Sequence, residues 1–171
     1  MRGKSAKPAL LKTIINKALD RDFIRVGRSR IEGRGVFAKR KIPKGARIIE
    51  YKGKRRAIAD LFVERSEGKS AHIYAFSLHE GTVIDGALGG NESRFINHSC
   101  EPNCEAYTFD DRVYIYAMRD MSRGEELTFD YQLRSAFGKA RKKSDESAYI
   151  CRCGAKNCRG TMLGGKRRKG K

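Results

Sequence analysis

The chain of 171 residues lacks any apolar run long enough to cross a membrane as a helix, which takes about 20 consecutive residues. Residues 1–20 also lack the continuous apolar stretch of a secretion signal, and internal repeats are absent. The length is that of a single domain that can bury a core of its own. We therefore expect an intracellular, soluble protein with no membrane partner.

Cysteine is missing from the first 99 residues, and all five cysteines follow them. Because an intracellular chain keeps its thiols reduced, disulfides are the weaker interpretation. Cys151, Cys153 and Cys158 form the pattern C-x-C-x4-C. This short loop supplies three thiolates, one fewer than a tetrahedral structural zinc demands. The fourth ligand must come from elsewhere, and on spacing alone both Cys100 and Cys104 remain open.

Acidic residues are scarce at both ends of the chain, which carries a net charge of +18. Residues 1–30 hold nine basic and two acidic side chains, residues 132–171 hold thirteen and two, and residues 31–131 hold sixteen of each sign. The last eight residues contain five cations and no apolar anchor, so we expect a disordered tail. The flanks also lack interleaved aromatic residues, which argues against specific base reading. They serve solubility or non-specific phosphate contact.

The apolar pattern changes once along the chain. Apolar residues recur with helical period over residues 8–19 and predict an amphipathic helix that braces the domain. From Phe23 onward, short stretches of strand-forming residues broken by glycine predict several small sheets. Helical spacing returns within residues 56–65 and predicts one short inserted helix.

The most informative segments are RFINHSCEPNC, residues 94–104, and GEELTFDY, residues 124–131. A folded core has little use for adjacent Asn97, His98 and Cys100 unless these side chains bind something. The pair therefore indicates a binding or catalytic site rather than packing.

These segments resemble the motifs of the SET-domain protein lysine methyltransferases, and further motifs follow in the family's order. IEGRGVFA, residues 31–38, resembles the glycine motif that opens the domain, and IYAFSL, residues 73–78, resembles its central tyrosine strand. CRCGAKNC, residues 151–158, resembles the cysteine segment that follows the domain in the mixed-lineage-leukaemia and trithorax type. A cysteine-rich segment before the domain is missing.

The resemblance implies a mostly β fold with short helices. It is the SET fold of several small sheets, with a pseudoknot-like active site and a zinc-bound C-terminal segment. The implied organisation is a basic N-terminal helix or flank at 1–22, a SET domain at 23–133, a polar connector at 134–150, a post-SET zinc segment at 151–163 and a disordered basic tail at 164–171.

The same resemblance assigns residues to a cofactor site and a metal site. The backbone groups of the glycine motif that would approach S-adenosylmethionine are those of Glu32, Gly33, Arg34 and Gly35. The side chains of Tyr74 and Asn97 would contact its methionine part. The backbone of His98 would contact adenine. In the family the cysteine of the Asn-His-Ser-Cys segment completes the zinc site, so the implied ligands are Cys100, Cys151, Cys153 and Cys158. Structural roles are expected for Asp85, Arg94, Glu125 and Asp130.

The implied reaction is methyl transfer from a sulfonium to an amine, an in-line displacement that needs an uncharged, aligned lysine. An apolar aromatic channel and the adjacent sulfonium both lower the pKa of the lysine from about 10.4, so no dedicated general base is required. Tyr131 is the expected catalytic residue, and Tyr74 is the second aromatic wall. Phe129 occupies the family's phenylalanine or tyrosine switch and leaves room for more than one methyl group.

The sequence thus predicts an S-adenosylmethionine-dependent protein-lysine N-methyltransferase that forms di- or trimethyl-lysine in a histone or another basic protein. We expect a monomer in the nucleus or in a bacterial cytoplasm and nucleoid, two locations between which the sequence does not decide. Two alternatives remain: a catalytically silent SET domain that binds lysine-bearing tails, and a small basic zinc protein that binds nucleic acid.

Overall fold

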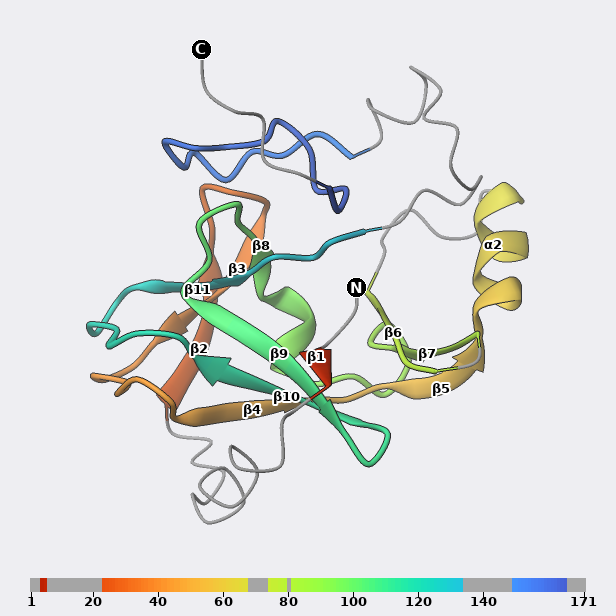
Figure 1. Cartoon of the computed structure of the whole chain (residues 1–171), viewed down its shortest axis with the longest axis horizontal. Coiled ribbons are helices and arrows are strands. Elements are labelled where there is room, and N and C mark those ends of the chain that lie inside the picture. Colours follow the sequence, from red (N-terminus) through yellow and green to blue (C-terminus); the bar gives the residue numbers. More distant parts are fainter. Residues whose placement is uncertain (1–3, 6–22, 68–73, 80, 134–148, 166–171) are drawn as a thin grey trace.

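Strands dominate the computed structural model, which describes residues 4–5, 23–67, 74–79, 81–133 and 149–165 (Figure 1). The mostly β fold predicted from the sequence is confirmed. The strands are β1 (Lys4–Ser5), β2 (Ile24–Arg28), β3 (Arg34–Ala38), β4 (Arg47–Tyr51), β5 (Lys54–Ala57), β6 (Ala75–Ser77), β7 (Thr82–Asp85), β8 (Asn97–His98), β9 (Cys104–Phe109), β10 (Arg112–Ala117) and β11 (Glu126–Phe129).

The strands form two sheets. The larger one has eight strands in the order β2-β3-β11-β9-β10-β4, with β1 beside β9 and β8 beside β11. The smaller one has the order β5-β7-β6 and lies with helix α2 on the opposite side of the molecule from β2 and β3 (Figure 1). The small sheets expected from the short strands are therefore partly joined into one. The joint is β11, because it pairs with β3, β8 and β9 from distant parts of the chain.

The core is built mainly from side chains of the larger sheet, with Phe76 and Ile84 added from the smaller one. In β10, Val113 and Ile115 are fully buried on one face, and Val36 of β3 and Leu127 of β11 are fully buried as well. Successive side chains of a strand point to opposite faces, and in β10 both faces are covered, because Tyr114 and Tyr116 on the other face are buried as well. Each such burial stabilises the fold by roughly 1.5–3 kcal/mol.

One α-helix, α2 (Ile58–Ser66), is present in the described part of the chain, and it confirms the short helix predicted within residues 56–65. It begins only at Ile58 because Arg56 and Ala57 still belong to β5, where they pair with β7. The helix predicted over residues 8–19 lies outside the described residues. No helix in the described ranges has the length and apolar character needed to cross a membrane.

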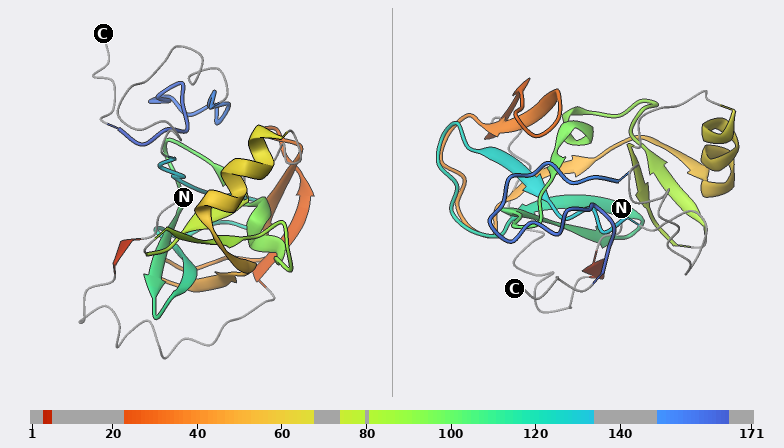
Figure 2. Two further views of the ribbon diagram at one scale, coloured as in Figure 1. Left: turned by 90° about the vertical axis from the view of Figure 1, so that its right-hand side faces the viewer. Right: turned by 90° about the horizontal axis from the view of Figure 1, so that it is seen from above.

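Two pairings position the candidate site. A short 3-10 helix, η2 (Glu92–Phe95), leads into β8, which runs parallel to β11 with Asn97 opposite Thr128 and His98 opposite Phe129. Residues 149–165, called the closing segment below, lie at the end of the large sheet near β8 and β3 (Figures 1 and 2). Leu133 anchors this segment, since its N–H donates to Met162 O at 3.1 Å and its C=O accepts from Gly164 N–H at 2.8 Å.

Candidate active site and metal centre

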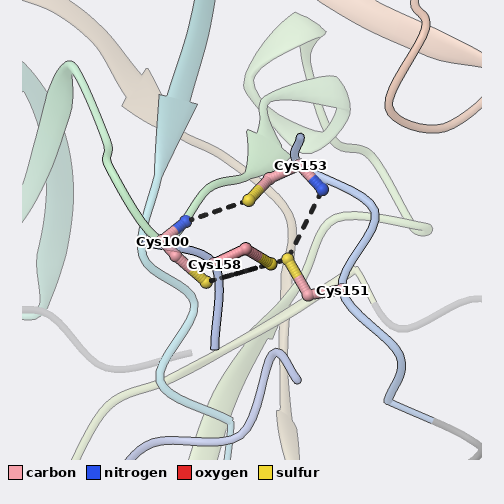
Figure 3. Close-up of side chains that lie close together, drawn as sticks. All are labelled: Cys100, Cys151, Cys153 and Cys158. Carbon is pink, nitrogen blue, oxygen red and sulfur yellow. Dashed lines mark hydrogen bonds between the residues drawn. The ribbon is translucent and has the colours of Figure 1, made fainter. Parts of the chain in front are cut away.

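Four cysteines meet where the closing segment touches the chain just after β8. The sulfur atoms of Cys100, Cys151, Cys153 and Cys158 all lie within 4.8 Å of one another (Figure 3). Cys100 Sγ is 3.8 Å from Cys151 Sγ and 4.0 Å from Cys158 Sγ. Four thiolates about 2.3 Å from a tetrahedral zinc lie roughly 3.8 Å apart, so the spacing of this cluster fits a structural zinc.

Backbone N–H groups also favour thiolates in this cluster. The N–H groups of Cys100 and Cys153 point at sulfur atoms of the cluster at 3.5 Å, and Arg159 N–H donates to Cys100 Sγ at 3.3 Å. Burial raises the pKa of the Cys153 thiol, but hydrogen bonds from the N–H groups of Cys100 and Ala155 outweigh it and lower the pKa to about 7. Thiolate is the form that binds metal.

Cys104, the alternative fourth ligand, is placed elsewhere. It begins β9 opposite Phe129 and is 1% exposed within the hydrophobic core. Burial raises the pKa of its thiol to about 12. Cys104 thus behaves as a small apolar core residue, and the structure groups Cys100 with the other three cysteines instead.

An ion pair forms a second connection between the closing segment and the domain. The Arg159 guanidinium donates to both carboxylate oxygens of Asp130, at 2.7 and 2.6 Å. The two side chains are only 9% and 18% exposed. Bidentate pairs of this kind are the stronger ones, and this pair joins the residue after Cys158 to the residue before Tyr131.

Tyr131 is held at both ends. Its hydroxyl donates to Ile96 O at 2.8 Å, and its backbone N–H donates to His98 Nδ1 at 3.1 Å. Burial, followed by the nearby Tyr74 and Glu126, raises the pKa of the Tyr131 phenol, so the hydroxyl stays protonated. Burial likewise lowers the pKa of His98 to about 4. The neutral His98 accepts at Nδ1, and its Nε2 lies 3.5 Å from Cys100 Sγ.

Aromatic rings surround Tyr131. Phe129 is 2% exposed, and its ring centroid lies 5.0 Å from that of Tyr131 and 6.3 Å from that of Phe76. Tyr74 packs edge-on against Phe95 at 6.1 Å. Of the predicted catalytic residues, Tyr131 and Phe129 thus pack against each other, and Tyr74 packs against Phe95. Aromatic surroundings of this kind desolvate an amine.

The two glycines of the IEGRGVFA motif serve different purposes. Gly33 has φ of +37° and open space around it, so it is needed for backbone conformation. At Gly35 a β-carbon would overlap the Glu126 carboxylate. The group that lies close to Gly35 is therefore the Glu126 side chain. From the sequence, the backbone of this motif was expected to lie close to the cofactor.

The remaining predicted cofactor residues lie around the same loop. Glu32 pairs with Arg152 of the closing segment at 3.1 Å, with both side chains largely exposed. The Arg34 guanidinium lies 3.9 Å from the centre of the Phe95 ring. Asn97 donates its side-chain amide to Arg34 O at 2.9 Å. The structure thus brings the glycine motif, the Asn-His motif and the closing segment to one place.

Sequence reasoning missed several residues of this site. Arg159 gave no signal beyond its position after Cys158. Tyr51, whose hydroxyl donates to Tyr74 O at 2.6 Å, read only as part of an apolar strand. Ser29 and Glu126 bind each other and Asn97. Ser29 lies outside every motif, and Glu126 lies within GEELTFDY, where its neighbour Glu125 was given a structural role instead.

The comparisons with known proteins agree with this geometry. Residues 33–132 match the family described as SET domain, which excludes the interpretation that the Asn-His motif is coincidental. The histone-lysine N-methyltransferase trr of Drosophila melanogaster is 40% identical over 149 residues, 83% of this chain and 6% of that protein. Histone-lysine N-methyltransferase 2B of Homo sapiens is 38% identical over 149 residues, 84% of this chain and 5% of that protein.

A yeast relative extends the likeness. The H3 lysine-4 specific histone-lysine N-methyltransferase of Saccharomyces cerevisiae is 39% identical over 145 residues, 79% of this chain. This chain spans only 13% of that protein, so each of the three relatives is much longer than the region it shares. The match over 100 residues, the order of the strands and the grouping of the motifs lead to one conclusion: the chain belongs to the SET-domain family.

Proposed function

We propose that this chain is an S-adenosylmethionine-dependent protein-lysine N-methyltransferase. The observation that carries the proposal is the pairing of β8 with β11, which sets Asn97 and His98 beside Tyr131 and its aromatic neighbours. The names of the relatives, all histone-lysine N-methyltransferases, support the reaction class.

The amine of a lysine must reach the site uncharged. Phe129, Tyr74 and Tyr131 form apolar walls that favour the neutral amine. The Tyr131 phenol stays protonated because burial raises its pKa, so its role is to orient the amine rather than to remove a proton. When bound, S-adenosylmethionine supplies the methyl group.

The proposed cofactor residues are those of the glycine motif, the tyrosine strand and the Asn-His motif: Glu32, Gly33, Arg34, Gly35, Tyr74, Asn97 and His98. They fit a ligand that offers donor groups, because the Asn97 amide nitrogen is already engaged and its oxygen remains as an acceptor. The residues that would hold zinc are Cys100, Cys151, Cys153 and Cys158, whose sulfur atoms have the spacing of a tetrahedral site.

Product and substrate follow from Phe129 and from the relatives. Because Phe129 lacks a hydroxyl that would crowd the amine, we infer di- or trimethylation. The substrate we propose is a lysine in a histone, with another basic DNA-binding protein as the alternative. The protein acts as a monomer on chromatin or in a nucleoid, and its basic flanks add non-specific phosphate contacts.

The test is methyl transfer itself. Purified protein and isotopically labelled S-adenosylmethionine are incubated with recombinant histones and, separately, with a bacterial nucleoid protein, and mass spectrometry locates the methylated lysine. We expect label on lysine of one basic protein. Tight binding of cofactor and tail without any transfer would instead identify a silent SET domain.

A further inference from the structure

Three side chains form a compact polar network beneath the Asn-His motif. Asn97 Nδ2 donates to Glu126 Oε1 at 2.8 Å, and the Ser29 hydroxyl donates to the same oxygen at 2.7 Å. Ser29 Oγ in turn accepts from Asn97 Nδ2 at 3.1 Å. Asn97 is 8% exposed, whereas Ser29 and Glu126 are half-buried.

The partners of Asn97 leave its amide only one orientation. Arg34 O and the Glu126 carboxylate can only accept hydrogen bonds, so the Asn97 nitrogen must face both of them. Its two hydrogens are thereby used. Within the described ranges no donor reaches Asn97 Oδ1, and this oxygen is the end of the amide that is left to meet a ligand.

Gly35 preserves this arrangement. A β-carbon at position 35 would overlap Glu126 Oε1 and crowd the Ser29 side chain. The missing side chain therefore gives the carboxylate its place below Asn97. Glu126 pairs with Phe37 of β3, and Gly35 lies two residues from Phe37 along the same strand, so Gly35 and Glu126 are diagonal neighbours.

We infer that Glu126 is a positioning residue that presents Asn97 Oδ1 as an acceptor for the α-ammonium group of the cofactor. The inference rests on the proposed use of S-adenosylmethionine. An ammonium is a pure donor, and a fixed acceptor oxygen selects it. If the Asn97 amide could rotate freely, its NH₂ group would face the ammonium in part of the molecules, and the contact between Asn97 Oδ1 and the ammonium would be weaker.

The experiment measures the affinity of two ligands by calorimetry: S-adenosylmethionine and its analogue without the α-amino group. Glu126→Ala removes one of the two groups that can only accept from Asn97 Nδ2 and leaves Arg34 O alone to orient the amide. We expect the dissociation constant of the full cofactor to rise about tenfold, as for loss of one hydrogen bond to a charged group. The constant for the analogue should stay within about twofold, since it lacks the group that Asn97 selects. Equal losses for both ligands, or no loss, would overturn the inference.

Three further variants sharpen the result. Glu126→Gln keeps an oxygen that can accept both hydrogen bonds, so it should restore affinity to within about threefold of the wild type; a Gln variant as weak as the Ala variant would mean that charge matters and not orientation. Gly35→Ala should reproduce the selective loss of Glu126→Ala by displacing the carboxylate. The control is Glu125→Gln. In the wild type the Glu125 carboxylate binds Arg119 and Asn103 rather than Asn97, so this variant should bind both ligands normally.

The wild type separates this inference from the proposed function. If it binds neither ligand, the proposed function fails and the inference with it. If it binds S-adenosylmethionine and the Glu126→Ala variant binds it equally well, only the inference fails. Thermal unfolding of each variant shows that the compared proteins are folded.

Discussion

Phe129 is the last residue of β11, and Tyr131 follows it by two positions. Their ring centroids are 5.0 Å apart. They differ in chemistry by one hydroxyl group, and in Tyr131 that hydroxyl donates to Ile96 O. At the residue scale, the proposed roles of both residues depend on this hydroxyl: its presence in Tyr131 affects turnover, and its absence from Phe129 affects how many methyl groups are added.

Replacing Tyr131 with phenylalanine tests the orienting role. If the hydroxyl contacts the amine in the transition state, Tyr131→Phe should lower turnover by roughly tenfold to a thousandfold while the dissociation constant of the cofactor stays nearly unchanged. Single-turnover kinetics and calorimetry measure the two quantities. Normal turnover in this variant would remove Tyr131 from the reaction.

Replacing Phe129 with tyrosine tests the product. The added hydroxyl takes space beside Tyr131 and holds water, so Phe129→Tyr should shift the product to monomethyl-lysine at a similar rate of first transfer. Mass spectrometry of the peptide product at successive times distinguishes the methylation states. A wild type that already stops at monomethyl-lysine would contradict the role given to Phe129.

At the scale of elements, the closing segment is attached in three ways. The cysteine cluster, the pair of Arg159 with Asp130, and the backbone hydrogen bonds of Leu133 all hold it beside β8 and β11. The segment has little regular structure of its own, with one bridge between Ile150 and Thr161. A bound metal would therefore contribute directly to its order, because metal binding is coupled to folding in such small sites.

We predict one zinc per chain and a shared loss of metal and activity. Cys100→Ala and Cys153→Ser should each lose zinc and turnover, because three thiolates hold the ion much more weakly than four. Cys104→Ala is the matched control: it lies in the core outside the cluster, so it should keep its zinc. Elemental analysis of protein purified without chelator decides this, and full zinc in Cys100→Ala would reassign the fourth ligand.

At the scale of the whole molecule, the net charge lies in the two flanks of the sequence, and the second flank includes the closing segment. The flanks, residues 1–30 and 132–171, carry the whole net charge of +18, because residues 31–131 hold equal numbers of basic and acidic side chains. Much of both flanks lies outside the described residues. A balanced domain between basic ends is suited to a peptide substrate whose surroundings are rich in phosphate.

Deleting residues 166–171 tests the tail. The deletion starts after Gly165 because Gly164 N–H donates to Leu133 O and so belongs to the packed structure. It should weaken binding to duplex DNA and flatten the salt dependence by about 0.9 in slope for each phosphate that the tail no longer neutralises. Turnover on a short free peptide should stay nearly intact, with a neutral tail of equal length as the control. A similar loss on the free peptide would place the tail in the active site.

The helix and the strands could be predicted from the sequence because each depends on residues that are close together in the chain. The helix expected within residues 56–65 is present, and its start at Ile58 differs only because β5 extends through Ala57. The strands were predicted from short stretches of strand-forming residues broken by glycine. Their union into an eight-stranded sheet was not, because β11 recruits β3, β8 and β9 from positions far away in the chain.

The sequence by itself determined the chemistry that is available: three thiolates in one loop, an Asn-His pair and a strand that ends in Asp-Tyr. It also determined the family, through motifs in a fixed order. It could not choose between Cys100 and Cys104 by spacing, nor between Glu125 and Glu126. Glu126 begins β11 and Glu125 precedes it. Only the pairing of β11 with β3 and β8 decides that the Glu126 carboxylate lies beside Asn97 while that of Glu125 binds Asn103 and Arg119.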